Sequence, residues 1–287
     1  ELAQWVNFRP VCPEMAIGLP TPRPAIRLTL TDSGETQLRF SKPPHDDLTQ
    51  KMVDFMADYL PKIGDLSGFI VCAKSPSCGL ERVRLYDENG NRGRKEGVGL
   101  FTAALLETWP WLPVEEDGRL HDPVLRENFV ERVFALHELN TLRKNGLTRR
   151  ALLDFHSRYK LQLLAHHQAG YREIGPFVAS LHEWEDLDAF FVAYREKLMT
   201  ILKKPASRKN HTNVLMHIQG YFRNQLNTRQ RGELRDVILH YRNGQLPILA
   251  PITLLKHYLA EYPDRYLMTQ NYFDPYPDDL GLRLAIT

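Results

Sequence analysis

A short apolar run that ends in a turn is the feature that most constrains the fold of this chain. The run Phe69–Cys72 is typical of a strand buried on both faces. The chain is expected to leave the extended path at Ser75-Pro76, because proline has no amide hydrogen and restricts the residue before it. The segment therefore predicts an α/β sheet with Cys78 at the carboxyl end of a strand, where ligands bind in this fold class. A structural cysteine in a tight turn is the alternative.

The rest of residues 1–146 alternates between strand-like and helical segments. Besides the strand at 69–72, we expect strands at Trp5–Cys12, Ile26–Leu30, Thr36–Phe40 and Leu112–Glu116. We expect helices at Asp47–Leu60, Gly99–Thr108 and Asp122–Arg143, a proline-stiffened loop at Gly18–Pro24, and a mobile loop at Asn91–Gly97. This alternation predicts a three-layer α/β domain with a mainly parallel sheet.

Residues 147–287 contain helical patterns with almost no strand signal. Apolar residues recur at helical spacing in six segments: Thr148–Ala169, Gly170–Leu181, Leu187–Leu202, Lys209–Leu226, Thr228–Asn243 and Ile252–Tyr262. Before them, the sequence Lys144-Asn145-Gly146 is typical of a helix C-cap followed by a turn. We therefore predict an α/β domain over residues 1–146 and an all-α domain over residues 147–287.

The two halves also differ in charge. Residues 1–146 hold 18 Lys/Arg and 21 Asp/Glu, a net −3, whereas residues 147–287 hold 19 and 14, a net +5. This asymmetry suggests that the second half meets an anionic partner. No apolar run is long enough to cross a bilayer, and three cysteines are too few for a disulfide framework. We therefore expect a protein of the reducing cytoplasm that makes no membrane contact.

Two cysteines, Cys12 and Cys78, lie at the predicted ends of strands. They are too far apart in sequence to form a local zinc knuckle, whose ligands come in close pairs. Thiolates with few histidines nearby favour an iron–sulfur cluster over zinc. Such a cluster needs a further ligand, and the remaining cysteine, Cys72, is expected to lie inside its strand. A purely structural role for the cysteines stays open on this evidence.

A carboxylate and two hydroxyls accompany these thiols in the sequence. Glu14 follows Cys12 by two residues, and Ser75 and Ser77 precede Cys78. A carboxylate next to a metal thiolate can act as a general base toward a water molecule. Such residues are also common in exposed loops and turns, and that alternative is retained.

The stretch from Arg195 to Arg242 holds 11 Lys/Arg against three acidic residues. Tyr221 and Phe222 lie within it, and basic charge interleaved with stackable rings is typical of proteins that bind a phosphate backbone. The alternative is that these charges only keep the helices soluble. For a nucleic-acid contact, we single out the following residues: Lys203, Lys204, Arg208, Lys209, Arg223, Arg229 and Arg231.

Several motifs together resemble a known family. Val11–Pro20 (VCPEMAIGLP), Lys74–Leu80 (KSPSCGL), Gly99–Phe101 and Leu112–Glu116 look like the TudS-type thiouracil desulfidase domain. The second half, from Leu153–His156 through His166-His167 and Tyr171-Arg172, is similar to the helical domain often fused to it. The fusion resembles the RudS group, whose members remove sulfur from 4-thiouridine in tRNA.

This resemblance implies a [4Fe-4S] cluster held by three cysteines, with Cys12 and Cys78 at two of the positions. The third is expected upstream of Glu1, because the sequence begins without a methionine and in the middle of the family's pattern. Glu14 is implied to activate water, and the helical domain to bind tRNA. Ser75, ahead of Ser77, is implied to orient the base or a proton carrier. Sulfur would leave as hydrosulfide in a reaction without net redox change.

Two other classes of protein fit the same residues. One is a non-catalytic RNA-binding protein whose α/β half is only a scaffold, and the other is a regulatory protein that senses a cluster. Neither would release sulfide from a thiolated base, and the first would hold no iron.

Overall fold

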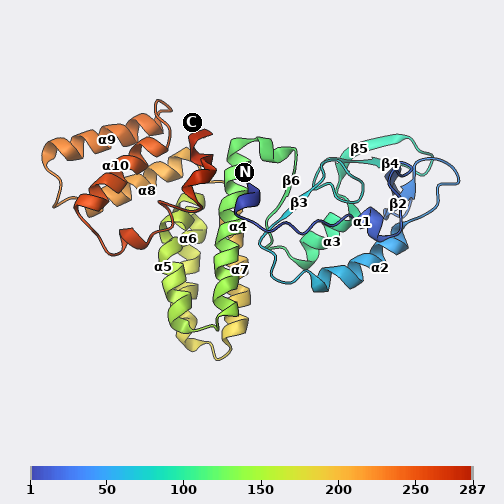
Figure 1. Ribbon diagram of the computed structural model, residues 1–287, viewed down its shortest axis with the longest axis horizontal. Coiled ribbons are helices and arrows are strands. Elements are labelled where there is room, and N and C mark those ends of the chain that lie inside the picture. Colours follow the sequence, from blue (N-terminus) through green and yellow to red (C-terminus); the bar gives the residue numbers. More distant parts are fainter. Residues whose placement is uncertain (1, 286–287) are drawn as a thin grey trace. The chain divides into compact units, whose positions relative to one another are not determined.

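The computed structural model describes residues 2–285, which divide into two compact units, residues 2–121 and residues 122–285. The first unit contains strands and helices, and the second contains helices only (Figure 1). The predicted succession of an α/β and an all-α part is therefore confirmed. The division lies before the long helix α4 (Pro123–Lys144) rather than after Gly146, because α4 packs on α5 (Arg149–His166) and α7 (Leu187–Leu202).

Two separate sheets form the strand framework of the first unit. The larger one has the order β2-β1-β4-β5, built from β2 (Thr36–Phe40), β1 (Ile26–Leu30), β4 (Val83–Tyr86) and β5 (Arg92–Gly97). Strand β1 pairs antiparallel with β2 and parallel with β4, and β4 pairs antiparallel with β5. The smaller sheet pairs β3 (Phe69–Val71) in parallel with β6 (Val114–Glu116). The pairing is thus mixed, and the larger sheet is not mainly parallel as expected.

Among the described residues, the first unit has three α-helices: α1 (Pro13–Ala16), α2 (Thr49–Tyr59) and α3 (Leu100–Thr108). The predicted helices at Asp47–Leu60 and Gly99–Thr108 are therefore confirmed. Ring contacts join α2, α3 and β3, because Phe101 lies 6.1 Å from Phe55 and 5.6 Å from Phe69 between ring centroids. These ring contacts anchor the first residue of β3. The cysteine-containing loop follows its last residue, Val71.

Three local predictions in the first unit are wrong. Trp5–Cys12 forms no strand, since it finds no partner strand among the described residues, and Phe8 is 58% exposed. Asn91–Gly97 is not a mobile loop but contains β5, which forms a hairpin with β4 through a turn closed by Asp87 and Asn91. In β3, Ile70 is 37% exposed, so that strand is not buried on both faces.

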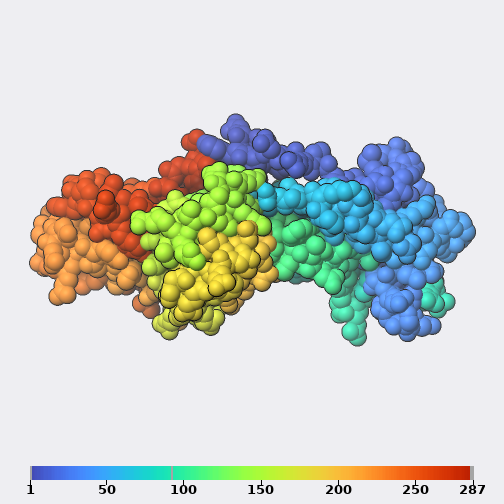
Figure 2. Space-filling model, turned by 90° about the horizontal axis from the view of Figure 1, so that it is seen from below, coloured from blue at the N-terminus to red at the C-terminus, as the bar shows by residue number. Residues whose placement is uncertain are grey.

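The second unit contains the six predicted helices after α4. They are α5, α6 (Gln168–Ala179), α7, α8 (Arg208–Tyr221), α9 (Thr228–Arg242) and α10 (Leu249–Glu261). Side-chain caps mark several of their starts, among them Thr148, Asp186, Ser207 and Asn227. The side chains of α8 to α10 pack around a buried apolar core. Figure 2 shows the outer surface of these helices in orange and red.

A short 3-10 segment, η7 (Leu282–Ala285), returns to α4 near the end of the described chain. It brings the buried Arg283 to the first turns of that helix. Within residues 2–285, no helix has both the length and the hydropathy needed to cross a membrane.

Candidate active site in the first unit

Glu14 meets both predicted serines, although they lie far from it in sequence. The hydroxyl of Ser77 donates to Glu14 Oε1, and that of Ser75 lies 3.4 Å from the same oxygen. The two hydroxyls are 3.0 Å apart, and Ser75 Oγ also accepts from the amides of Ser77 and Cys78. The structure thus joins the carboxylate on α1 to the turn that carries Cys78.

The turn around Cys78 is held tightly by the start of α3. The amides of Leu100 and Phe101 donate to the carbonyls of Pro76 and Ser77, and the Thr102 hydroxyl donates to the Cys78 carbonyl at 2.6 Å. A Cβ on Gly99 would lie 2.5 Å from the Ser77 carbonyl, closer than side chains approach in proteins. Glycine at this position is therefore what lets α3 approach the turn and fix its backbone.

Arg23 is a site residue that sequence reasoning did not identify. Its Nε lies 2.7 Å from Glu14 Oε2, and its Nη2 donates to Cys12 Sγ at 3.6 Å. It belongs to the proline-stiffened loop Gly18–Pro24, where we assigned it no function, and it is the only basic residue of that loop. The Glu14 carboxylate consequently has donors on both oxygens, which fixes its orientation.

The cysteines differ in their surroundings. Burial raises the pKa of the Cys78 thiol to about 11, with further contributions from the Glu14 carboxylate and the nearby Cys12. Cys72 lies just beyond β3 and is exposed, so it is not inside the strand as expected. Burial and the carboxylate of Asp117 raise the pKa of Cys72. Without a cation or metal, the Cys72 and Cys78 thiols stay protonated near neutral pH.

The site suits a thiolate-bound metal cluster in its chemistry. Cys12 and Cys78 are both half-buried. Arg23, whose Nη2 donates to Cys12 Sγ, also has a buried Nη1 without a hydrogen-bond partner among the described residues. An anionic group next to Arg23 would satisfy that guanidinium nitrogen. In the part of the chain that the structure describes, no group of three His, Cys, Asp or Glu is arranged to hold a metal ion. At this place the described residues thus provide two half-buried thiols, Cys12 and Cys78, and no complete metal-binding set.

Acidic residues of β6 support the chain that follows Cys78. Glu116 Oε1 accepts from the Leu80 amide at 2.9 Å and from the Glu81 amide at 3.3 Å. Glu115 binds Arg119, which also pairs with Glu81 at 2.5 Å. These buried carboxylates hold the backbone of the turn, while Glu14 is the carboxylate that shares the site with the thiols. A group of this kind can accept a proton from a bound water and return it to a leaving group.

The predicted nucleic-acid residues do not form one cluster. Lys203, Lys204 and Lys209 are exposed around the connection between α7 and α8, whereas Arg223, Arg229 and Arg231 surround the connection between α8 and α9. Since α8 has 14 residues, the two groups lie about 20 Å apart along it.

Arg208 belongs to neither group. It is half-buried, and its guanidinium lies over the ring of Tyr241, 5.8 Å from the centroid.

Comparison with known proteins gives matches on both units. A family model described as 2-thiouracil desulfurase matches residues 1–117, and the model of a domain described as a protein of unknown function, DUF1722, matches residues 160–277. The Escherichia coli (strain K12) protein named "Uncharacterized protein YbgA" is 51% identical over 152 residues, which cover 53% of this chain and 90% of that protein. No solved structure matches the chain.

Proposed function

The chain belongs to the family that joins a 2-thiouracil desulfurase domain to a DUF1722 domain, and from this premise we propose that it removes sulfur hydrolytically from thiolated uracil, in particular from 4-thiouridine in tRNA. The desulfurase domain itself supports a thiouracil desulfidase activity acting on a thiolated base. The observation that carries the proposal is the meeting of Glu14, Ser75 and Ser77 beside Cys12 and Cys78, all inside the matched residues.

The proposed reaction exchanges sulfur for oxygen at one ring carbon. Water adds to the carbon of the C=S group, the C–S bond breaks, and the products are the C=O base and hydrogen sulfide. Glu14 takes the proton from the attacking water and later delivers it to the departing sulfur, so no oxidant or reductant is needed. Ser75 and Ser77 hold the carboxylate from one side and Arg23 from the other.

We propose that Cys12 and Cys78 are two of the ligands of a [4Fe-4S] cluster. Such a cluster supplies an iron atom that binds the soft thiocarbonyl sulfur and polarises the C=S bond. The buried, unpartnered Nη1 of Arg23 supports a negatively charged group at this place. The exposed Cys72 is not among the proposed ligands.

The second unit is proposed to bind the tRNA. Its net positive charge and the exposed lysines around the α7–α8 connection support this role. Ribose–phosphate contacts there would add affinity for tRNA over the free base, because each neutralised phosphate releases counterions.

The test is sulfide release and iron content of the full-length protein prepared without oxygen. Substrates are 2-thiouracil, 4-thiouracil, 4-thiouridine and tRNA that contains 4-thiouridine. Cys12→Ser and Cys78→Ser should lose iron and activity, whereas Cys72→Ser should keep both. Glu14→Gln should keep iron while turnover falls by about two to four orders of magnitude. The exposed Glu35, which lies in a hairpin turn, gives the matched control Glu35→Gln.

The results separate the alternatives. Iron without sulfide release from any substrate would favour a cluster-sensing regulator, and tRNA binding without iron would favour a non-catalytic RNA-binding protein. Full turnover of Glu14→Gln would remove this carboxylate from the mechanism.

A further inference from the structure

A small cavity with both polar and apolar walls lies in the second unit, remote in sequence from the cysteines. Its volume is about 160 Å³, and it is lined by Val124, Glu127, Ala206, Arg208, His211, Tyr241 and Ile248. That space corresponds to about five water molecules, and it is smaller than the pockets of roughly 300 Å³ or more that take drug-sized ligands. Any occupant is therefore a molecule of only a few heavy atoms.

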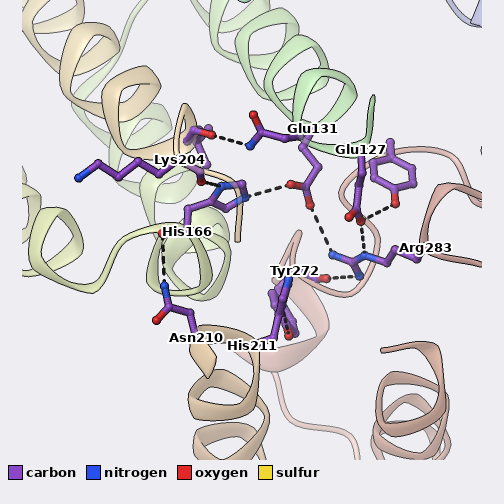
Figure 3. A network of polar contacts seen from close by, with 11 residues as sticks. Glu127, Glu131, His166, Lys204, Asn210, His211, Tyr272 and Arg283 are labelled. Carbon is purple, nitrogen blue, oxygen red and sulfur yellow. Dashed lines mark hydrogen bonds and ion pairs between the residues drawn. The ribbon is translucent and has the colours of Figure 1, made fainter. Parts of the chain in front are cut away.

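One wall of the cavity is backed by a buried ionic cluster (Figure 3). Glu131 lies between His166 and Arg283, with its oxygens 2.9 Å from His166 Nε2 and 3.5 Å from Arg283 Nη2. Arg283 Nε lies 3.0 Å from Glu127 Oε1. The other nitrogen of His166, Nδ1, faces the Lys204 carbonyl at 2.7 Å, so both ring nitrogens face acceptors. His166 is therefore an imidazolium. The carboxylates of Glu127 and Glu131 are then balanced by the cations His166 and Arg283, so the cluster is neutral overall.

Arg283 is fully occupied by this cluster and is not free to bind a ligand. Besides the two carboxylates, it donates from Nη1 to the carbonyls of Tyr272 and Phe273 at 2.9 and 3.5 Å. The remaining cation of the cavity wall is Arg208, which has no carboxylate within ion-pair distance among the described residues. The cavity thus carries one uncompensated positive charge.

The position of Arg208 is built into the fold. The Tyr241 ring supports its guanidinium from one side. On another side lies Gly244, where an added Cβ would clash with Arg208 Nη1. Gly244 also has a φ of +78°, a conformation that side chains other than glycine rarely adopt. The glycine in the turn after α9 therefore leaves room for the Arg208 guanidinium, which is held in place by Tyr241 and the turn rather than by an acidic residue.

Two further groups of the wall have free hydrogen-bonding capacity. Glu127 Oε1 accepts from Arg283 and from the Tyr276 hydroxyl at 2.8 Å, whereas no described residue donates to Oε2. His211 binds the Tyr272 hydroxyl through Nδ1 at 3.0 Å, which leaves its Nε2. Burial lowers the pKa of His211 to about 3, so its ring is neutral near pH 7. The wall thus combines a cationic fork, a carboxylate oxygen and a neutral imidazole.

We propose that this cavity binds a small 2-hydroxycarboxylate, with its carboxylate on the Arg208 fork and its hydroxyl donating to Glu127 Oε2. A guanidinium binds a carboxylate through two parallel hydrogen bonds. Val124, Ala206 and Ile248 would contact the short apolar part of the ligand. A monoanion balances the charge of Arg208, whereas a zwitterionic amino acid leaves it uncompensated. This site is independent of the desulfidase proposal.

The test is calorimetric titration of the full-length protein with L-lactate, in the absence of any thiolated substrate. Propionate lacks the hydroxyl and L-alanine adds a positive charge, so both should bind at least about tenfold more weakly, which corresponds to about 1.4 kcal/mol. Equal binding of propionate would refute the Glu127 contact, and equal or tighter binding of alanine, uracil or inorganic phosphate would refute the ligand class.

Variants place the binding site. Arg208→Met should weaken lactate binding by about ten- to a hundredfold, as expected for charge-assisted hydrogen bonds. Arg242→Met is the matched control at the exposed end of α9 and should bind as the parent. If Arg208→Met does not fold, Arg208→Lys keeps the charge but lacks the fork and should still lose most of the affinity. Unchanged affinity in both Arg208 variants, or no heat of binding to the parent, would overturn the proposal.

Discussion

At the scale of single residues, Arg23 has the clearest role that its sequence position did not reveal. It contacts Glu14 and Cys12 through two different nitrogens, so it links the proposed general base to the proposed cluster ligand. The prolines of this loop indicate only that its backbone is stiff and not helical. Nothing in the sequence spacing from Glu14 to Arg23 indicates that the two side chains form a contact. Glu14, Ser75 and Ser77 were singled out through the family resemblance, and the structure brings them together. An ion pair between two loops depends on the folded backbone.

We predict that Arg23→Met lowers turnover by about ten- to a hundredfold, since Glu14 loses a charge-assisted hydrogen bond that orients it. The effect should fall on kcat more than on KM, because Arg23 positions Glu14 rather than the base. Arg23→Lys should recover part of the activity. The exposed Arg9 provides the control Arg9→Met. An Arg23→Met enzyme with parental kcat would show that the ion pair only ties two loops together.

At the scale of elements, the strand β3 and the helix α3 on either side of the cysteine turn were predictable from the sequence, but two other segments of the first unit were not. The helix and the strand before the turn follow from apolar periodicity, and both were found. Trp5–Cys12 carries a strand-like pattern but pairs with nothing described, and β5 consists of charged residues and glycine. Whether a segment forms a strand depends on which strands become its neighbours in the fold. The local sequence pattern therefore predicted neither the absence of a strand at Trp5–Cys12 nor the presence of β5.

We predict that Gly99→Ala reduces desulfidase activity and destabilises the first unit by about 1–3 kcal/mol, because the new methyl group would overlap the Ser77–Cys78 peptide. Gly118→Ala is the control, since its Cβ would meet only the Ala73 side chain at 3.8 Å. Urea unfolding and sulfide release should be measured on both variants. Equal stability and activity for the two would mean that the turn is more adaptable than the structure indicates.

At the scale of the whole molecule, the buried histidines of the second unit bound the pH range of its stability. Burial lowers the pKa of His156 to about 4 and of His211 to about 3. In the unfolded chain both titrate near 6.5, so the stability from their neutral forms is lost as pH falls from 6.5 through 4 and 3. The pKa of His166 is raised by the Glu131 carboxylate against the opposing effect of burial. Its contribution is therefore complete below pH 6.5 and is lost as pH rises through that raised value.

We predict a maximum of stability near neutral pH, with the steeper loss on the acid side. The shift of His156 alone corresponds to about 3 kcal/mol between pH 7 and pH 4. Urea unfolding of the full-length protein from pH 4 to pH 9 measures this, and His156→Gln should flatten the acid limb. An acid limb that is unaffected by this substitution would assign the acid loss to other groups.

We also predict that the exposed lysines around the α7–α8 connection bind tRNA more strongly than the arginines beyond α8. Lys203→Glu with Lys209→Glu should weaken tRNA binding and flatten its dependence on salt concentration, by about 0.7–0.9 in slope for each phosphate that is no longer neutralised. Arg223→Glu with Arg229→Glu is the matched pair, and it should have the smaller effect because Arg229 already faces Glu233 at 3.6 Å. The reverse order of the two double variants would move the RNA contact to the other end of α8.

The position of Arg283 in the chain also has a consequence for biosynthesis. This arginine neutralises Glu127 and Glu131 on α4, yet it follows Glu127 by 156 residues. While the ribosome is still adding the intervening helices, His166 is the only cation of the cluster that has emerged to face those two carboxylates. Because burying two carboxylates against a single cation is unfavourable, we expect this end of α4 to complete its packing only after the last turn of the described chain has left the exit tunnel.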